Sequence, residues 1–454
     1  MIIGRNSELN QLETYYERDN SQIIVVYGQK YIGKTSLIRE FFQDKPSYYY
    51  LAEACSEREQ KYRLGSYLAE LGIKSLKFPE FEQVFECFSL KHTQKKVIVF
   101  DEFQNIIKNC PDFLGKLTSF IHSKWNNQQY LVILMSSSVG FVENSMVEKI
   151  GDAAFELSGF IKLKELSFDD LREHFCLYTN DDCATVYSIL GGVPGLWEMF
   201  DIKLSVQENI IRSILSPSGN LRYVAQGFVN DELRETNVYN TILGSIALGK
   251  HKLNDLYEHT GFSRAKISVY LKNLSELELV GKVFSVDTEG HDNSQKGLYD
   301  ITNNFVDFFY TFIFGKGSLL ESLSKEEFYK FHIAPGLKQY TGKYYKKICL
   351  EYIQKQNSKN KLPFKAEHFG EWIGKQGNID IVATDDNGKT LLALCVLDKP
   401  MVTYDDYEWM MFVAKKACLY ADYIYLFAGT RFDEKLSLEG KIRSNLKLFL
   451  LDNI

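Results

Sequence analysis

The first third of the chain alternates short apolar runs with amphipathic segments. Apolar runs without a polar interruption occur at Ile23–Tyr27, Val97–Phe100 and Tyr130–Met135. Such runs are typical of strands that are buried on both faces of a parallel sheet. The segments Ser36–Phe42 and Phe113–Lys124 have helical spacing. This alternation predicts an α/β sheet with right-handed crossover connections.

Further along the chain the hydrophobic spacing is helical. A helix-capping sequence at Ser167–Asp170 opens a region that indicates helices only, up to about residue 235. From Asn237 three short amphipathic segments follow, and the last two are joined by a glycine turn, which predicts a helix-turn-helix. The apolar run Val280–Val286, the turn-rich DTEGHDNSQKG and a second strand at Leu298–Ile301 would supply a wing. An aromatic stripe at helical spacing comes next and is typical of a core helix.

Composition limits the class of protein. A chain of 454 residues with 45% hydrophobic and 25% charged positions is folded and long enough for about three domains. The formal net charge of −6 and the lack of a polybasic tail mean that any nucleic-acid contact would be local. Eight scattered cysteines without a C-x-x-C pair indicate free thiols rather than zinc ligands. With no apolar run of about 18 residues, we expect a cytoplasmic protein that does not enter a membrane.

The loop after the first strand carries a phosphate-binding pattern. Gly28–Thr35 matches G-x-x-x-x-G-K-[ST] between a buried strand and a helix, which is the context that the motif requires. The glycines allow backbone N–H groups to face phosphates, Lys34 would reach the β and γ phosphates, and Thr35 would bind Mg²⁺. The alternative is a glycine turn with an accidental lysine. The residues expected at the nucleotide are Gly28, Gln29, Lys30, Tyr31, Ile32, Gly33, Lys34, Thr35 and Ser36.

A second strand ends in two carboxylates. Val97–Phe100 is followed by Asp101 and Glu102, which is the pattern of a Walker B segment. Asp101 is expected to orient Mg²⁺, and Glu102 to act as the base that polarises the attacking water. The alternative is that both acids cap a helix. The next strand ends in three serines, and Ser136 is the candidate sensor of the γ-phosphate, although serines after strands are also ordinary turn residues.

These motifs, together with two further segments, resemble a known family. Ile3–Leu9 is similar to a "GRxxEL" box, Asp101–Gln104 to a DEFQ form of Walker B, and Gly191–Pro194 to a G-x-P turn that closes the nucleotide site from a helical lid. Together they resemble the archaeal-type ATPases of the STAND class, P-loop NTPases related to AAA+ proteins. The resemblance implies an ATP-binding hydrolase with ATP and Mg²⁺ as cofactors, and places Arg5 and Pro194 at the nucleotide.

One departure from the family concerns arginine. Family members usually carry an arginine after the sensor strand, whereas no arginine occurs between Ser138 and Lys164. Because an arginine finger contributes about 10³ to 10⁵ in rate, we expect slow hydrolysis unless Arg5, Arg172 or a partner chain supplies the charge. Tight binding with slow turnover suits a switch.

The patterns and the resemblance together predict four parts. Their expected ranges are a P-loop ATPase core at 1–165, a helical lid at 166–235, a winged helix plus aromatic helix at 236–330, and a degenerate restriction-endonuclease-like α/β domain at 331–454. The predicted winged helix carries less positive charge than is typical of a DNA-binding domain. Residues 237–314 hold seven Lys or Arg against nine Asp or Glu. Arg264, Lys266 and Lys272 are the candidate DNA contacts, and a winged helix used only for packing remains the alternative.

The C-terminal part resembles a nuclease fold that lacks its chemistry. The resemblance places the strand-end aspartate of the fold at Asp380, but Leu394 and Val396 stand where Glu and Lys belong, and Lys346 replaces a helix acid. One carboxylate cannot assemble two-metal chemistry, so we expect no nuclease activity. The alternative is a relocated pair at Asp398–Lys399.

Two classes of function remain open from the sequence. The first is a slowly hydrolysing ATPase that acts as a nucleotide-dependent switch on DNA or on a protein partner, which includes a second copy of the chain. The second is an ATP-licensed nuclease in DNA processing or defence. The loss of Glu-x-Lys favours the first class.

Overall fold

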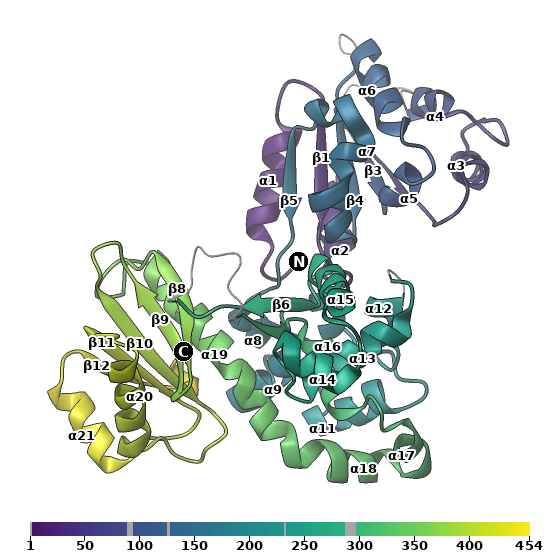
Figure 1. The fold of residues 1–454 in the computed structure, drawn as a ribbon. Coiled ribbons are helices and arrows are strands. Elements are labelled where there is room, and N and C mark those ends of the chain that lie inside the picture. The colour runs from purple at the N-terminus through teal and green to yellow at the C-terminus, as the bar shows by residue number, and fades with distance from the viewer. Residues whose placement is uncertain (1, 89–93, 125–127, 231–232, 287–296) are drawn as a thin grey trace. The chain divides into compact units, whose positions relative to one another are not determined.

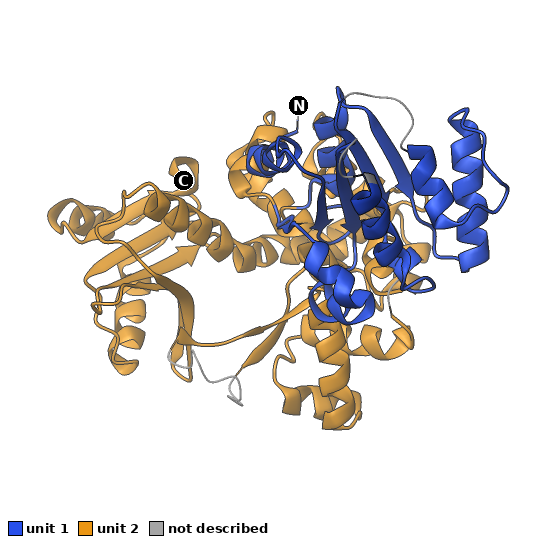
Figure 2. Cartoon of the chain, turned by 90° about the horizontal axis from the view of Figure 1, so that it is seen from above, with its two compact units in different colours: residues 1–165, 193–195 blue, residues 166–192, 196–454 orange. Residues whose placement is uncertain are grey.

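The computed structural model describes residues 2–88, 94–124, 128–230, 233–286 and 297–454. The chain forms two compact units (Figure 2). Unit 1 consists of residues 1–165 and 193–195, and unit 2 of residues 166–192 and 196–454. The finer division of the chain into four parts stays a prediction.

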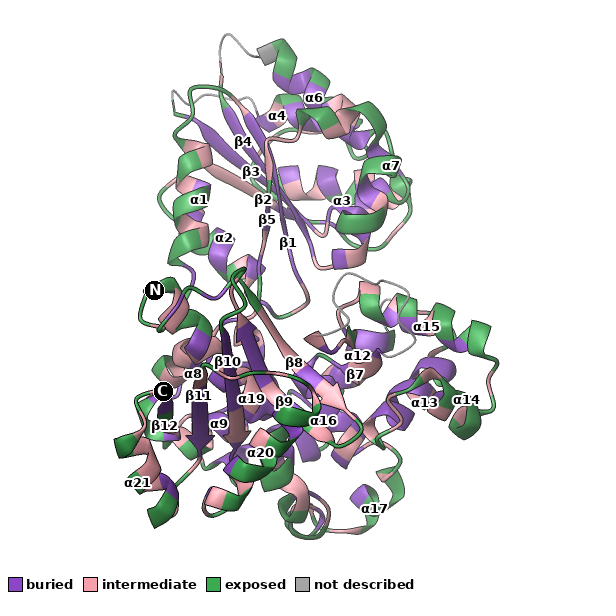
Figure 3. Ribbon diagram, turned by 60° about the vertical axis from the view of Figure 1, so that its left-hand side comes forward, coloured by how far each residue is buried: buried purple, intermediate pink, exposed green. Residues whose placement is uncertain are grey.

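Unit 1 is built on a parallel sheet, as the sequence predicts. Its strands in spatial order are β2 (Ser47–Leu51), β3 (Lys96–Asp101), β4 (Tyr130–Ser136), β1 (Gln22–Tyr27) and β5 (Gly159–Lys162). All the pairings are parallel, and β1, β3 and β4 are buried along their whole length (Figure 3). The sequence missed β2 and β5, which lie at the two edges and are only partly buried. Because the strands are parallel, the ends of β1, β3 and β4 meet at one edge of the sheet.

The helices of unit 1 cover the sheet (Figure 1). They are α1 (Asn6–Tyr16), α2 (Lys34–Phe42), α3 (Glu57–Glu70), α4 (Phe81–Phe88), α5 (Gln104–Ile107), α6 (Phe113–Lys124) and α7 (Met146–Ile150), with a π-turn at Phe141–Ser145 and a 3-10 turn at Gly151–Glu156. Alternate residues of β1, such as Val25, belong to the same buried cluster as Phe85 of α4 and Phe113 of α6. The rings of Phe85 and Phe113 meet edge-on at 5.6 Å. Truncating one such ring to alanine costs about 3 to 5 kcal/mol, so this aromatic core holds the sheet edge in place.

The first part of unit 2 is helical. Its elements are α8 (Phe168–His174), α9 (Asn180–Leu190), α10 (Pro194–Trp197), α11 (Val206–Asn209), a π-helix (Ile210–Leu215) and α12 (Val224–Asn230), with the first residues of α10 counted in unit 1. The predicted capping sequence is confirmed, because Ser167 and Asp170 form a capping box at the start of α8.

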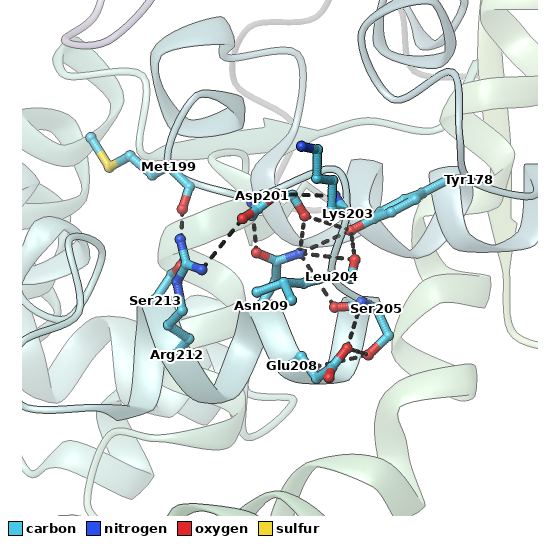
Figure 4. Close-up of polar contacts among 10 residues, drawn as sticks. All are labelled: Tyr178, Met199, Asp201, Lys203, Leu204, Ser205, Glu208, Asn209, Arg212 and Ser213. Carbon is cyan, nitrogen blue, oxygen red and sulfur yellow. Dashed lines mark hydrogen bonds and ion pairs between the residues drawn. The ribbon is translucent and has the colours of Figure 1, made fainter.

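Asn209 fixes the loop that leads into α11 (Figure 4). Its buried amide nitrogen donates to the Tyr178 hydroxyl at 2.9 Å and to the Asp201 carbonyl at 2.8 Å, while its oxygen accepts from the Asp201 backbone N–H at 2.7 Å. Ser205 and Glu208 add a capping box at the start of the same helix. Since a buried amide without partners costs about 1 to 3 kcal/mol, this network serves to hold the loop.

Unit 2 contains the three helices and the strand pair that the sequence predicts for a winged helix. They are α13 (Thr236–Ala247), α14 (Leu253–Thr260), α15 (Arg264–Glu276) and the antiparallel pair β6 (Val280–Val283) and β7 (Leu298–Ile301). Strand β6 ends at Val283 rather than Val286, because the chain leaves β7 and Ser285 bridges to Glu371 on another sheet. Residues 287–296 of the predicted wing turn lie outside the described residues.

The aromatic stripe forms α16 (Asn304–Phe312), and this helix lies inside unit 2. Asn304 donates to the Tyr187 carbonyl of α9 at 2.8 Å, and Tyr310 donates to Asn240 of α13 at 2.6 Å. The helices that follow are α17 (Gly317–Ser322), α18 (Lys325–Phe328), a π-turn (Tyr329–Ile333) and the long α19 (Ala334–Ser358). The stripe is therefore core, as the sequence indicates.

The C-terminal part of unit 2 holds a mixed five-stranded sheet. The strands are β8 (His368–Gly374), β9 (Gly377–Thr384), β10 (Thr390–Val396), β11 (Tyr423–Ala428) and β12 (Leu446–Leu450), with helices α20 (Tyr404–Lys416) and α21 (Glu434–Ile442) and a closing 3-10 turn (Leu451–Asn453). Strands β8, β9 and β10 pair antiparallel, and β10, β11 and β12 pair parallel. Met410 of α20 packs with Val396 on one face of this sheet, and Tyr345 of α19 donates to the Ala428 carbonyl at 3.3 Å.

The expectation that Asp380 ends a strand is wrong. Asp380 lies inside β9, and its carboxylate accepts from the Cys395 backbone N–H of β10 at 2.8 Å. The backbone ladder between the two strands ends at the pair Ile381 and Ala393. Beyond that pair, the Asp380 carboxylate accepts from the backbone of β10 in place of a carbonyl group, so it does not project from an open strand end.

Candidate functional site

The loop between β1 and α2 has the backbone that its glycines permit. Gly33 has a φ of 95°, which lies in the left-handed region that favours glycine. A Cβ on Gly28 would lie 2.7 Å from the carbonyl oxygen of Leu163, the residue that follows β5. Any side chain at position 28 would therefore clash with the backbone there. Tyr31 also takes a positive φ, at 65°. The loop thus wraps tightly ahead of the first turn of α2, whose N–H groups have no partner within the helix.

Lys34 is the buried cation of this loop. Its ammonium group donates to the Gly28 carbonyl at 2.7 Å and to the Gln29 carbonyl at 3.1 Å. Burial lowers the pKa of Lys34 to about 8, and the nearby Glu102 and Asp101 carboxylates oppose that shift. The lysine is therefore largely charged at neutral pH and is held by carbonyl groups that weaken its hydration.

Glu102 adopts a strained conformation at the end of β3. Its φ of 53° is left-handed, which costs about 1 to 3 kcal/mol for a residue that is not glycine. Its carboxylate accepts from the Ser137 hydroxyl at 2.8 Å and from the Ser137 backbone N–H at 3.3 Å, and also from the Gln104 amide. These contacts compensate the strain and fix where the carboxylate points.

Asp101 and Thr35 face a residue that the sequence reasoning missed. The hydroxyl of Tyr49, on β2, donates to the Asp101 carboxylate and lies near the Thr35 side chain. Burial raises the pKa of the Asp101 carboxyl group, and the Tyr49 hydrogen bond opposes the shift. A tyrosine on an unrecognised edge strand gave no signal in the sequence.

These groups surround one cavity of about 360 Å³ within unit 1. Its lining residues are Lys30, Tyr31, Gly33, Lys34, Thr35, Ser36, Asp101, Glu102, Ser137 and Gly195. The cavity combines a cation, a hydroxyl, two carboxylates and a helix N-terminus. A larger cavity of about 700 Å³ lies between α4 and α6. Its lining carries Glu82, Glu86, Asp112 and Asp152 against Lys116, so it is unsuited to phosphate.

The other residues predicted at the nucleotide support the loop from outside the cavity. Arg5 is buried, donates to the Ile32 carbonyl at 2.8 Å and pairs with Glu8 at 3.0 Å. Pro194 lies against Gly33, since a Cβ on that glycine would be 3.3 Å from the Pro194 ring. Ser136 is fully buried and accepts from the Ser138 backbone N–H at 3.1 Å.

Gly28, Gln29 and Ile32 also belong to the loop without lining the cavity. Gln29 donates to Glu165 at 3.4 Å, and the Ile32 carbonyl receives Arg5. The structure thus brings together Lys34, Thr35, Asp101 and Glu102. It puts Ser137, rather than Ser136, beside the candidate base.

The basic residues of the predicted recognition helix lie at the surface of unit 2. Arg264, Lys266 and Lys272 are exposed on α15. Arg264 donates to Asn254 at 2.8 Å and stacks on Tyr257 at 4.1 Å. Lys272 is 3.9 Å from Glu276. They share an exposed helix, which leaves DNA contact through α15 as a proposal.

The residues expected at a degenerate nuclease site are engaged by the protein itself. Burial raises the pKa of Asp380 to about 6, partly opposed by the hydrogen bond from Cys395. Lys346 of α19 pairs with Glu371 of β8 at 2.6 Å. Lys399 pairs with Asp406 at 2.6 Å, and Asp398 lies against Gly342. Among the described residues, no group of three or more metal-ligating side chains is placed to hold an ion.

Two families match separate parts of the chain. Residues 2–200 match an ATPase domain predominantly from Archaea, and residues 309–396 match archaeal and bacterial proteins of unknown function. An uncharacterized protein of Methanocaldococcus jannaschii is 29% identical over 394 residues, which is 86% of each chain. An uncharacterized ATP-binding protein of the same organism is 36% identical over 45 residues, 10% of this chain and 76% of that protein. Residues 2–200 are therefore similar to the archaeal ATPase domain that the motifs of the chain resemble.

Solved structures to which the chain is similar include two archaeal proteins. The Walker-type ATPase paby2304 of Pyrococcus abyssi matches 68% of this chain and 96% of its own, at 17% identity and a TM-score of 0.47. The ORC2 protein of Aeropyrum pernix, solved as ADPNP and ADP complexes, matches 72% and 94%, at 12% identity and a TM-score of 0.46. In the described parts of this chain, no helix is long and apolar enough to span a bilayer.

Proposed function

We propose that this chain binds Mg-ATP in the cavity of unit 1, hydrolyses it slowly and acts as a nucleotide-dependent switch. The observation that carries the proposal is the meeting of Lys34, Thr35, Asp101 and Glu102 around one cavity at the ends of β1 and β3. The side chains around the cavity fit Mg-ATP. A hydroxyl and a carboxylate are the oxygen ligands that Mg²⁺ prefers, and a lysine with a helix N-terminus suits phosphate.

Each residue has a role that follows from its position. Thr35 and Asp101 would hold Mg²⁺, which supplies charge stabilisation at the phosphates. Lys34 exchanges its carbonyl contacts for the β and γ phosphates. Glu102, fixed by Ser137, orients a water and accepts its proton.

Hydrolysis is slow because neither Arg5 nor Arg172 is placed to act as an arginine finger in the cavity. Arg5 is committed to the Ile32 carbonyl and to Glu8, so its charge supports the loop rather than the cavity. Arg172 belongs to unit 2, where it pairs with Asp169. Without an arginine finger in the cavity, ATP remains bound for long periods, as a switch requires.

The output of the switch passes through unit 2 to DNA or to a protein partner, including a second copy of this chain. The exposed Arg264, Lys266 and Lys272 are the proposed DNA contacts. We propose that the C-terminal sheet has no nuclease activity, because Leu394 and Val396 provide neither ligand nor charge. The alternative, an ATP-licensed nuclease, requires metal-dependent nicking of supercoiled plasmid that disappears in Asp380→Ala.

A fluorescent-nucleotide titration tests the binding site. Lys34→Ala removes the buried cation and is expected to weaken Mg-ATP binding by at least 100-fold, since charged hydrogen bonds to two phosphates are lost. Lys74→Ala, an exposed lysine of the same unit, is the matched control and should bind as the wild type does. Unchanged affinity in a folded Lys34→Ala variant would overturn the proposed site.

A further inference from the structure

The hydroxyl of Tyr49 contacts a proposed metal ligand. It donates to the Asp101 carboxylate and lies near the Thr35 side chain, which is the other proposed ligand. Thr35 lies in the first turn of α2 and Asp101 ends β3, so the tyrosine lies where these two segments meet. The hydrogen bond engages a carboxylate oxygen of Asp101.

The ring of Tyr49 is fixed by its own surroundings. It packs against Phe42 with ring centroids 6.2 Å apart, and the Arg39 guanidinium lies 5.9 Å from its centre. The backbone N–H of Tyr49 donates to the Tyr67 hydroxyl at 3.0 Å. Because α2 and α3 both hold this residue, its hydroxyl is directed at the site rather than left free to rotate into solvent.

The Tyr49 hydroxyl and a metal ion compete for the Asp101 carboxylate. A phenol keeps its proton at neutral pH, and here its O–H donates to Asp101. Mg²⁺ requires near-octahedral oxygen ligands and gives up its waters reluctantly. A hydroxyl that donates to Asp101 therefore competes with the ion for that carboxylate.

We propose that Tyr49 gates metal entry: its hydroxyl engages the Asp101 carboxylate and must release it before Mg²⁺ is bound. The inference rests on the proposed function and adds a regulatory residue to that site. Tyr49 is a positioning residue, since it acts through Asp101. The gate stabilises the metal-free arrangement and raises the Mg²⁺ concentration that nucleotide loading requires.

The neighbouring Tyr48 supplies a matched control. It lies on the same strand with its side chain on the opposite face, and its ring packs on Phe88 at 4.6 Å in the aromatic core. Tyr48→Phe removes a hydroxyl from the same strand without touching the site. Tyr49→Phe keeps the ring contacts with Phe42 and Arg39 and removes only the hydroxyl that donates to Asp101.

The test is a Mg²⁺ titration at a fixed concentration of a fluorescent ATP analogue, read as bound nucleotide in full-length protein. In Tyr49→Phe the Mg²⁺ concentration at half-saturation should fall about tenfold, the factor that corresponds to about 1.4 kcal/mol and to one hydrogen bond to a charged group. Tyr48→Phe should match the wild type. In a thermal melt without nucleotide or metal, Tyr49→Phe should melt lower, and Mg-nucleotide should raise its melting temperature by more than it raises that of the wild type.

The outcomes are distinguishable. A Tyr49→Phe midpoint equal to that of the wild type, or above it, overturns the gate, even if the melting temperature of the empty protein falls, because a structural role alone would give that fall. If neither the wild type nor Tyr49→Phe binds the analogue at any Mg²⁺ concentration, the proposed function fails and the gate fails with it.

Discussion

The chain contains two α/β sheets with an aspartate each, and only one of these aspartates lies at an open edge. Asp101 ends a parallel strand, lines a cavity and has Thr35, Lys34 and Glu102 nearby. Asp380 lies within β9, and its carboxylate accepts a hydrogen bond from the Cys395 backbone N–H. The difference shows that a strand carboxylate becomes a site only where the sheet ends and other polar groups converge. The same residue type is a structural group where its carboxylate accepts from the backbone of the neighbouring strand.

The largest expected effect comes from the base. Glu102→Gln keeps the hydrogen bonds to Ser137 but cannot accept a proton, so phosphate release should fall by about 10² or more while nucleotide affinity is kept. Steady-state phosphate release and a nucleotide titration measure the two quantities. Glu70→Gln, an exposed residue of the same unit, is the control. Hydrolysis at the wild-type rate in Glu102→Gln would reduce Glu102 to a capping residue.

Replacing each aspartate tests the comparison between the two sheets directly. Asp101→Asn removes a charge from the proposed metal site, and the Mg²⁺ concentration needed for nucleotide binding should rise by about tenfold or more. Asp380→Asn should leave that concentration unchanged. The same Mg²⁺ titration with a fluorescent nucleotide reads both variants, and an equal shift in the two would remove the distinction between the sites.

Lys34 gives the site a pH dependence. Its pKa is lowered to about 8 in the empty protein, so its charge is present below pH 8 and lost above it. Nucleotide phosphates favour the charged form, and ATP affinity should therefore be flat near pH 7 and about tenfold weaker at pH 9. Lys34→Arg, which keeps its charge throughout this range, should give a flatter profile. A wild-type profile that is flat to pH 9 would contradict the assigned role.

The smallest effect concerns Asp380 and the stability of unit 2. Its pKa is raised to about 6, above an ordinary value of about 3.9, so the native state favours the protonated form. The stabilising contribution is thus present below pH 4 and is lost as the pH rises through 6. Asp380→Asn should raise the free energy of unfolding by about 1 to 3 kcal/mol at pH 8 and leave it almost unchanged at pH 4. Thermal melts at the two pH values check this, and a destabilised variant at pH 8 would show that the charge is needed.

The sequence predicted the chemistry of unit 1 better than its supporting parts. The glycine loop, Lys34 and the strand that ends in Asp101 were identified because motif spacing and buried strands are local patterns. Strand β2 was missed because it is an edge strand whose residues are mostly half-buried, and Tyr49 was missed with it. Its role depends on the pairing of β2 with β3, which no local pattern encodes.

Register limited the predictions elsewhere. The choice between Ser136 and Ser137 depends on which face of β4 each residue takes at the strand end, and spacing alone gives both options. The resemblance placed Asp380 at a strand end, and the length of β9 cannot be read from its residues. Its bond to Cys395 follows from where the ladder with β10 stops, which is a tertiary property.

Hydrogen exchange of the full-length protein, measured with and without Mg-ATP, tests the central claim most directly. The account predicts that peptides covering residues 28–36 and 98–104 become protected, because the loop and the end of β3 contact the nucleotide and its metal. Protection should be lost in Lys34→Ala. Unchanged exchange in both segments of the wild type at saturating Mg-ATP would contradict the assignment of the site to unit 1.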